Sequence, residues 1–209
     1  MKNVILASSV ACLFASSAMA QVVNPGFEDA GGSFSGWTAF NNAVIESSVS
    51  RNASGHCAKF YGNWSGPYNA AGCFQDFPAT PGQNWTASAW FMTMAADPLA
   101  GSENFAILNI EWHAADGSMI SYITQRAVDG TSTPDVWQQF TISGEAPAGT
   151  TTARVVPLFL QPNFQGGAAF VDDVDFHVSN PPCTADFNGD GIVDFFDYLD
   201  FVDAFSAGC

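Results

Sequence analysis

The chain has 209 residues, of which 47% are hydrophobic, 14% aromatic and 12% charged. Five Lys and Arg residues stand against twenty Asp and Glu residues, so the formal net charge is −15. This charge excludes nucleic acid and anionic membrane surfaces as expected partners, because clustered basic residues hold both. The aromatic content also argues against disorder, since such a chain can bury a core. The length permits one ordinary domain with a small appendage.

Residues 1–20 have the pattern of a secretory signal peptide. Lys2 precedes an apolar run, and residues 18–20 read Ala-Met-Ala, the small-x-small pattern of a cleavage site. The run is too short for a lasting transmembrane helix, and no second hydrophobic span follows it. We therefore expect a secreted, extracellular chain that begins at Gln21 and does not insert into a membrane.

Four cysteines remain after this segment. An even number in an exported chain favours disulfides, and four cysteines allow three pairings. Bridges between neighbours along the chain would each contribute about 3 kcal/mol by limiting the unfolded state. A zinc site is the alternative, although neither neighbouring pair has C-x-x-C spacing. The expected disulfide residues are Cys57, Cys73, Cys183 and Cys209.

Residues 21–179 show the pattern of β-structure. Short runs of alternating polarity are separated by clusters of Gly, Pro, Asn and Ser, and no helical period persists for three turns before residue 190. Many short strands at this spacing predict an all-β fold, a jelly-roll β-sandwich of two sheets. The expected strands cover residues 56–61, 73–77, 85–94, 104–113, 119–127, 137–142, 152–160 and 168–178.

Residues 183–209 form a second module by composition, after an Asn-Pro-Pro linker at residues 180–182. The module carries six Asp and no basic residue. Within residues 186–197, oxygen-bearing side chains occupy positions 1, 3, 5, 9 and 12 of a twelve-residue loop, with Gly191 at position 6, as in calcium loops. A solvated acidic turn is the alternative. The expected calcium ligands are Asp186, Asn188, Asp190, the carbonyl of Ile192, Asp194 and Asp197.

This loop has an Asp at position 12 and is followed by one expected helix over residues 195–205, with none before it. It resembles a dockerin repeat, D-x-N-x-D-G-x-[IV]-x-x-x-D, and residues 183–209 resemble the single-repeat GC-type dockerin-like tails of bacterial secreted proteins. The resemblance implies attachment to a cell surface or extracellular complex through a cohesin-like or other surface receptor. It also implies that loop positions 10 and 11, Phe195 and Phe196, contact that partner. Packing of one or both under the helix is the alternative.

The sandwich carries a second resemblance, spread over residues 22–178. It is similar to carbohydrate-binding modules of the galactose-binding-like jelly-roll group. The resemblance implies non-catalytic glycan binding and a structural calcium near the meeting point of the first and last strands. The motifs are Asn-Pro-Gly-Phe-Glu at 24–28, Gly-Trp at 36–37, Ser-Ala-Trp at 88–90, Asp-Gly at 116–117, Trp-Gln-Gln-Phe at 137–140, Ala-Pro-Ala-Gly at 146–149 and Phe-Val-Asp-Asp-Val at 170–174.

Asp172 is the residue that gives this second calcium a physical basis. Strand alternation places it on the same side as Phe170 and Val174, which predicts burial of its carboxylate. A buried carboxylate needs a cation or several donors. We expect Glu28 and Asp172 to hold a structural calcium, and the alternative is that Asp172 caps backbone N–H groups without a metal.

Glycan recognition needs flat aromatic rings and amide or carboxylate groups for the sugar hydroxyls. Trp64 and Tyr68 lie in a Gly-, Asn- and Ser-rich loop and are the expected stacking residues. Residues 161–164 form another candidate loop. Alternation in residues 104–113 places polar side chains away from the core, on a face that we expect a neighbouring strand to share; a solvated outer sheet explains them equally. These side chains are Asn109, Glu111, His113 and, on the neighbouring strand, Gln125.

No motif predicts catalysis. The chain has three histidines without H-E-x-x-H spacing, no Gly-x-Ser-x-Gly elbow and no phosphate-binding loop. We therefore expect a non-catalytic glycan-binding protein with calcium as its only cofactor. The alternatives are a structural or adhesive surface protein without a sugar ligand, and a small jelly-roll polysaccharide hydrolase or lyase with a carboxylate pair formed in three dimensions.

Overall fold

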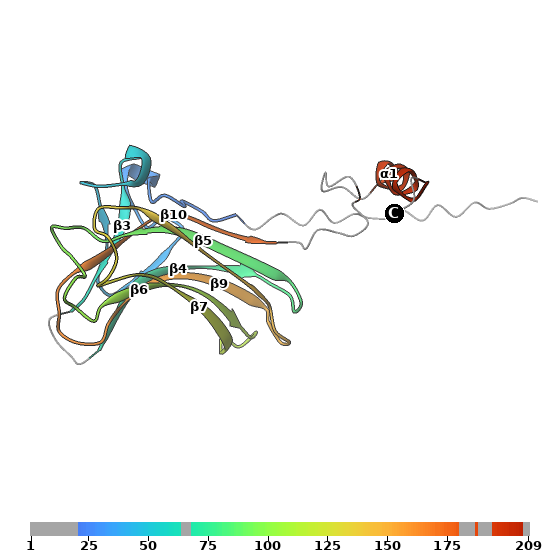
Figure 1. Cartoon of the computed structure of the whole chain (residues 1–209). Helices are drawn as coiled ribbons and strands as arrows, with labels where there is room; N and C mark the ends of the chain where they lie inside the picture. The colour runs from blue at the N-terminus through green and yellow to red at the C-terminus, as the bar shows by residue number, and fades with distance from the viewer. Residues whose placement is uncertain (1–20, 64–67, 180–186, 188–193, 207–209) are drawn as a thin grey trace, which may run out of the picture.

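The computed structural model describes residues 21–63, 68–179, 187 and 194–206, which form ten β-strands and one α-helix (Figure 1). Several predicted features lie outside these residues: the signal peptide, the linker, Trp64, Cys183, Cys209 and most of the calcium loop. The elements are β1 (Thr38–Phe40), β2 (Ala43–Glu46), β3 (Cys57–Tyr61), β4 (Asn69–Pro78), β5 (Asn84–Met92), β6 (Phe105–His113), β7 (Met119–Asp129), β8 (Gln138–Glu145), β9 (Thr152–Gln161), β10 (Ala168–Val178) and α1 (Phe195–Ser206).

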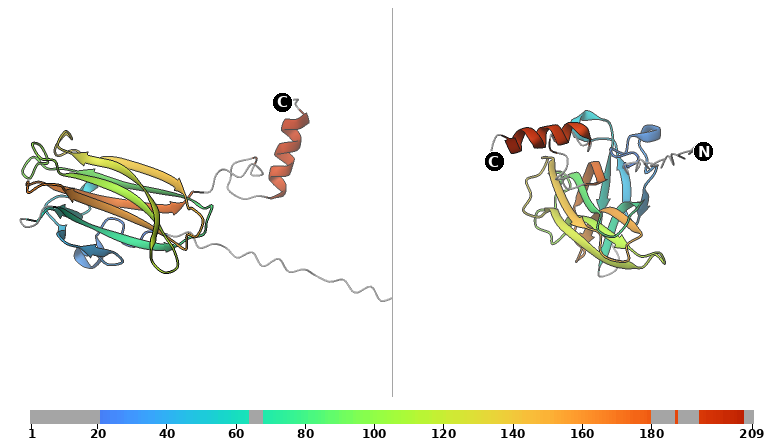
Figure 2. Two further views of the ribbon diagram at one scale, coloured as in Figure 1. Left: turned by 90° about the horizontal axis from the view of Figure 1, so that it is seen from below. Right: turned by 90° about the vertical axis from the view of Figure 1, so that its right-hand side faces the viewer.

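The strands form two five-stranded antiparallel sheets that face each other, as Figure 2 shows from two further sides. Sheet A has the strand order β1-β4-β9-β6-β7, and sheet B has the order β2-β3-β10-β5-β8. Strands that are neighbours in a sheet are mostly distant in sequence, so the chain crosses repeatedly between the two sheets. The predicted all-β jelly-roll sandwich followed by a C-terminal helix is confirmed.

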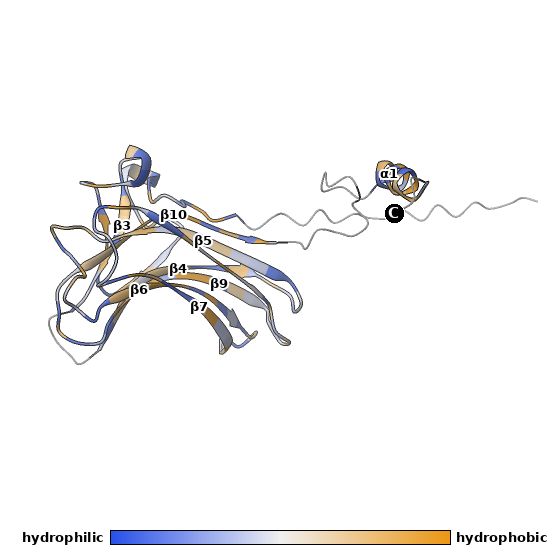
Figure 3. Ribbon diagram, in the orientation of Figure 1, coloured by the Kyte–Doolittle hydropathy of each residue, from blue (hydrophilic) through white to orange (hydrophobic). Residues whose placement is uncertain are grey.

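Alternate positions of the strands fill the space between the sheets, and hydrophobic and hydrophilic residues alternate along the ribbon in Figure 3. Trp85 and Phe176 are fully buried there and stack with ring centroids 4.6 Å apart. Trp112 is 3% exposed in the same core. Burial of each such side chain contributes about 1.5–3 kcal/mol, so this core is the main source of stability.

The sequence analysis does not predict two of the strands. β1 and β2 have only three and four residues, and they lie at the edges of sheets A and B. Neither has a fully buried residue, so no alternation of polarity marks them. The eight longer strands lie where the pattern predicts them, because each has enough residues to alternate between side chains that are buried or packed against the core and side chains that are exposed.

β10 departs from the regular alternation that the sequence analysis assumes. Its pairing with β5 shifts register between Asp172 and Asp175, and Asp173 has a φ of +45°. The bulge shifts which positions of β10 face the core between the sheets. Val171 faces it before the bulge, and Val174, three residues later, faces it after the bulge. Asp172 is completely buried, as expected, but on the outer side of sheet B with Phe170, not in the sandwich core.

The expectation that Cys57 and Cys73 take part in disulfides is wrong. Both cysteines are buried free thiols. Cys73 lies in sheet A and points into the core between the sheets, whereas Cys57 lies in sheet B and points outward, with its Sγ 3.2 Å from the carbonyl of Val49. The two side chains are therefore separated by sheet B itself. Burial raises the pKa of both thiols, which keeps them protonated and unreactive.

α1 matches the expected helix over residues 195–205 to within one residue. The ring of Phe187 meets the ring of Phe201, in the middle of α1, edge-on at 5.6 Å. Among the described residues, no helix has the length and apolar character needed to cross a membrane.

Candidate functional site

The outer face of sheet A carries a row of aromatic and charged side chains across four strands. β6 pairs with β7 so that Glu111 lies opposite Tyr122, and β6 pairs with β9 so that Glu111 lies opposite Arg154. β4 extends the row, because Asp76 lies opposite Arg154. Residues directly opposite in an antiparallel sheet share a face. The row Tyr122–Glu111–Arg154–Asp76 therefore crosses the sheet on the side away from the core.

This face is crowded even though no described strand or helix lies over it in Figure 1. Asn109 is 6% exposed, His113 7% and Val156 4%, although all three point away from the core. The sheet bows so that its outer face lies on the inside of the bend (Figure 1), which brings outward side chains of neighbouring strands together. A bowed sheet face with half-buried polar groups can hold an extended ligand across its strands.

Unsatisfied and paired polar groups lie side by side in this face. Nε2 of His113 is 3.2 Å from a carboxylate oxygen of Glu111, and Nδ1 of His113 is 3.2 Å from the carbonyl of Gly117. The side-chain oxygen of Asn109, two positions before Glu111, is buried without a hydrogen-bond partner. A buried oxygen without a donor is costly, so this amide is a position in the face where a hydrogen bond is unmet.

The cations of this face are all held by carboxylates. Arg154 donates from Nε and Nη2 to the two carboxylate oxygens of Asp76, at 2.6 and 2.9 Å, and its guanidinium lies 3.7 Å from the ring centre of Phe74. Arg126 pairs with Asp129 at 3.0 Å. Tyr122 stands beside these pairs with 57% of its surface exposed. The face thus offers an exposed aromatic ring next to a polar row whose arginine is paired with a carboxylate.

The sequence analysis located one strand of this face correctly and its neighbour incorrectly. Asn109, Glu111 and His113 share the outer face of sheet A, as expected. Gln125 does not join them, because β7 pairs it with the core-facing Leu108, and Thr124 lies opposite Asn109 instead. One position of strand register decides the face, and register is not visible in a single strand.

The most prominent residues of the row were missed altogether. Tyr122 and Arg154 lie in the predicted strands over residues 119–127 and 152–160, where alternation alone could have flagged them as outward-facing. Of the two expected stacking residues, Tyr68 is 61% exposed, and Trp64 lies outside the described residues.

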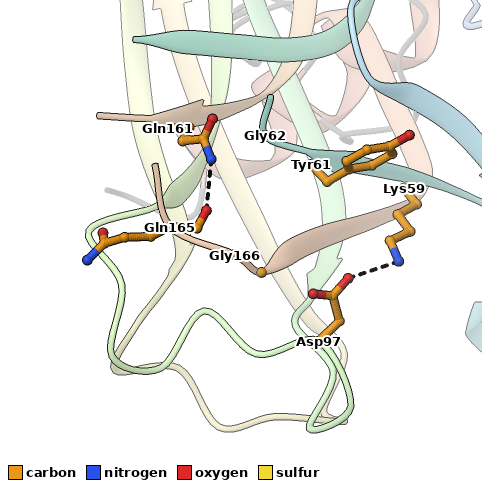
Figure 4. Close-up of a pocket in the computed structure, with 8 residues that line it drawn as sticks. Lys59, Tyr61, Gly62, Asp97, Gln161, Gln165 and Gly166 are labelled. Atoms are coloured by element: carbon orange, nitrogen blue, oxygen red, sulfur yellow. Dashed lines mark hydrogen bonds and ion pairs between the residues drawn. The ribbon is translucent and has the colours of Figure 1, made fainter. Parts of the chain in front are cut away.

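A second concave feature lies at one end of the sandwich (Figure 4). This end cavity has a volume of about 220 Å³. Nζ of Lys59 is 2.9 Å from the carboxylate of Asp97, and Nε2 of Gln161 donates to the backbone carbonyl of Gln165 at 2.8 Å. Tyr61 and three glycines complete its wall: Gly62, Gly166 and Gly167.

The predicted sandwich calcium site contains one buried and one paired carboxylate. Asp172 accepts hydrogen bonds from the backbone N–H groups of Arg51 and Asp173, each at 2.8 Å. Burial raises the pKa of Asp172 to about 6. Glu28 accepts from the backbone N–H of His56 and pairs with its ring, each at 2.8 Å. Desolvation raises the pKa of Glu28, but these hydrogen bonds outweigh it and leave the pKa lowered.

These contacts supply Asp172 with backbone N–H donors, as the alternative without a metal predicts. The pKa of Asp172 nevertheless remains raised, and a bound divalent cation would lower it. In the described part of the chain no three His, Cys, Asp or Glu side chains form a cluster that could hold a metal. A calcium here would therefore rest on Glu28, Asp172 and carbonyl oxygens, the oxygen ligands that calcium accepts. The sandwich calcium stays a prediction.

The described part of the tail holds the two acidic residues at the end of the predicted calcium loop. Asp197 is 3% exposed, and its two carboxylate oxygens accept from the backbone N–H groups of Phe187 and Asp194, each at 2.7 Å. The side chain at the last loop position thereby ties the first turn of α1 back to the loop. Phe195 and Phe196 are 65% and 64% exposed, so neither packs under the helix.

The chain matches no family model and no curated protein in sequence. Its fold matches solved structures at low identity. The xylan-binding CBM22-1 domain of Paenibacillus barcinonensis Xyn10C is 14% identical, with a TM-score of 0.53, and the match covers 80% of this chain and 99% of that domain. The Family 16 Carbohydrate Binding Module-2 is 14% identical, with a TM-score of 0.52 and coverages of 74% and 97%.

Enzymes also contain this fold. The enzymatically active domain of bacteriophage CBA120 tailspike protein 4 is 13% identical, with a TM-score of 0.55, and the match covers 76% of this chain but only 21% of that domain. The present chain thus spans about a fifth of the tailspike domain and nearly all of the two carbohydrate-binding modules. At such identities the comparisons establish a shared sandwich fold.

Proposed function

We propose that this chain is a secreted, non-catalytic glycan-binding protein whose carbohydrate lies on the outer face of sheet A. The observation that carries the proposal is the row Tyr122–Glu111–Arg154–Asp76, with the unpartnered oxygen of Asn109 beside it. A ring stacks on the apolar face of a sugar, while carboxylates and amides bond its hydroxyls. The likeness of the fold to two carbohydrate-binding modules over nearly their whole length supports the same function.

The charge of the face favours a neutral polysaccharide. Arg154 and Arg126 each pair with an aspartate, and Glu111 contacts the ring of His113, so the row presents no unpaired cation to an acidic sugar. The whole chain carries a formal charge of −15, which repels uronate-rich or sulfated chains at a distance. We therefore expect neutral chains such as xylan, glucan, mannan or galactan to bind, and polyuronates not to bind.

Affinity electrophoresis of the full chain against neutral and anionic polysaccharides tests this function. We expect Tyr122→Ala to weaken binding at least tenfold, which corresponds to about 1.4 kcal/mol for a lost stacking contact. Tyr198→Ala is the matched control, because Tyr198 on α1 is equally exposed, at 59%, but lies far from sheet A in sequence and fold. Tyr68→Ala tests the loop that the sequence analysis favours.

Each other outcome has a clear meaning. If Tyr68→Ala weakens binding and Tyr122→Ala does not, the carbohydrate lies at the loop rather than on sheet A. Absence of binding to every polysaccharide would favour the structural or adhesive alternative. Release of new reducing ends from a polysaccharide would overturn the non-catalytic proposal in favour of a hydrolase or lyase.

The tail adds attachment to this proposal. Residues 183–209 bind one calcium through the predicted loop, and the exposed Phe195 and Phe196 face a surface receptor or a cohesin-like partner. The contacts of Asp197 with the N–H groups of Phe187 and Asp194 support a closed loop at the start of α1. Chelation should reduce helix content and expose the tail to protease. Unchanged helix content and protease resistance would contradict a calcium site there.

A further inference from the structure

We propose that the end cavity is a second carbohydrate site, separate from the outer face of sheet A, that takes a single neutral sugar ring. This inference rests on the proposed glycan-binding function and adds a site to it. The cavity is bordered by Lys59, Tyr61, Asp97, Gln161 and Gln165 (Figure 4). Of these residues, the sequence analysis points only to Gln161, which belongs to the candidate loop of residues 161–164.

The charges of the cavity favour a neutral ligand. The ammonium of Lys59 is held by Asp97 at 2.9 Å and lies 5.3 Å from the ring centre of Phe170 and 6.0 Å from that of Tyr61. One cation and one carboxylate in contact cancel each other. Together they still present further N–H donors and carboxylate lone pairs, which suits adjacent hydroxyl groups that both donate and accept.

Buried amides behind the cavity wall have unmet hydrogen bonds. Asn69 lies opposite Gln161 in the pairing of β4 with β9, is 8% exposed, and has a side-chain nitrogen without an acceptor. Asn104 is 1% exposed and donates to the carbonyls of Gln165 and Gly166, while its own oxygen has no donor. Neither amide lines the cavity itself. Asn104 holds the backbone of Gln165 and Gly166, which do line it, and Asn69 lies opposite Gln161, so both amides fix polar groups of the wall in place.

The size of the cavity limits the ligand to one ring. About 220 Å³ is below the roughly 300–1,000 Å³ of sites for drug-sized ligands. Glycines set this size: a Cβ on Gly62 would overlap the amide of Gln161, and one on Gly167 would approach the carbonyl of Pro98 at 2.5 Å. A Cβ on Gly166, by contrast, meets no atom within 4 Å. Gly166 is therefore the position where a side chain can fill the cavity without disturbing its wall.

The end cavity and the row on sheet A are separate sites. Arg154 lies seven positions before Gln161 on β9, which corresponds to roughly 23 Å along the strand. Lys59 and Tyr61 belong to β3 in sheet B, not to sheet A. A chain laid across the row does not reach the cavity, so variants of one site should leave the other intact.

The test is ligand-observed NMR of the full chain with a panel of neutral monosaccharides and their methyl glycosides. We expect saturable binding of at least one sugar, weakened at least tenfold by Gly166→Leu, which fills the cavity, and by Lys59→Met, which keeps the apolar stem but removes the donors. Tyr198→Ala, which removes an exposed ring from α1 outside both sites, should leave monosaccharide binding unchanged. Polysaccharide binding by Gly166→Leu should match that of the unaltered chain.

The outcomes separate the two proposals. If no sugar of the panel binds, or if Gly166→Leu and Lys59→Met leave binding unchanged, the end cavity is not a sugar site. If polysaccharides also fail to bind, the proposed function itself fails. A thermal melt of each variant distinguishes loss of the site from loss of the fold. An unaltered melting temperature with lost monosaccharide binding supports the cavity.

Discussion

The two outer faces of the sandwich use the same residue types in opposite ways. On sheet B the loop of residues 47–55 lies over the outward side chains. Val49 packs against the cluster that contains Phe170, and the Arg51 guanidinium lies 4.2 Å from the ring centre of Trp90. Arg51 also pairs with Asp173. Here aromatic and charged side chains hold a cover in place.

Sheet A has the same pairing of arginine with an aromatic ring but no cover among the described residues. The guanidinium of Arg126 lies 3.9 Å from the ring centre of Phe105, and that of Arg154 lies on Phe74. Tyr122 remains exposed beside them. We infer that these residue types stabilise the fold where a loop covers them, whereas on the open face they are available to the ligand proposed above. If this is right, substitutions on sheet B should cost stability, and substitutions on sheet A should cost binding.

The largest effect is expected from Phe170→Ala. Phe170 is 1% exposed between sheet B and its covering loop, so the substitution should lower the free energy of unfolding by about 3–5 kcal/mol. Phe74→Ala is the matched control on sheet A, where the half-buried ring should cost only about 1 kcal/mol. Urea denaturation measures both. Equal losses would show that the two faces contribute to stability alike.

The largest pH dependence of stability that we expect from a single group comes from Asp172, which contacts the loop of residues 47–55. The pKa of Asp172 is raised to about 6 from an ordinary 3.8, so the folded state favours the protonated carboxyl. Its contribution is complete below pH 3.8 and is lost as the pH rises through 6. Without calcium, this group should lower the free energy of unfolding by about 3 kcal/mol between pH 3.5 and 7.

Asp172→Asn should remove this dependence of the unfolding free energy on pH. The same two chains also test the predicted sandwich calcium. A bound cation favours the ionised carboxylate, so saturating calcium should raise the melting temperature of the unaltered chain at pH 7 more than that of the Asp172→Asn variant. The proposed tail site is common to both chains, so the difference between them reports the sandwich site. An equal response of the two chains to calcium would instead support the alternative in which Asp172 only caps the N–H groups of Arg51 and Asp173.

The sequence predicts most of the fold because its strands are long enough to alternate. It predicts Asn109, Glu111 and His113 on one outer face for the same reason. It does not predict what depends on pairing between strands: the face of Gln125, the row to which Tyr122 and Arg154 belong, or the bulge at Asp172. These need register, which is set by long-range contacts rather than by the pattern of one segment.

The failed Cys57–Cys73 pairing has the same origin. The two cysteines are close in sequence, and an even number of cysteines in an exported chain makes a local bridge attractive. The chain nevertheless crosses from sheet B to sheet A between β3 and β4, and the two side chains end on opposite sides of sheet B. Sheet assignment, not distance along the chain, decides which cysteines can meet.

The smallest effect, and the most direct comparison, comes from two of the three stacked arginines, one on each sheet. Arg51→Ala removes a stacked, 24% exposed side chain that holds the loop over sheet B, so it should cost about 1–2 kcal/mol of unfolding free energy. Arg126→Ala removes a similar contact from a 53% exposed side chain, and it should cost less than about 1 kcal/mol. Chemical denaturation of both variants at two salt concentrations measures the difference. Equal costs would mean that the stacked arginine itself, rather than the loop above it, sets the energy, and the distinction between a covered and an open face would then lose its physical basis.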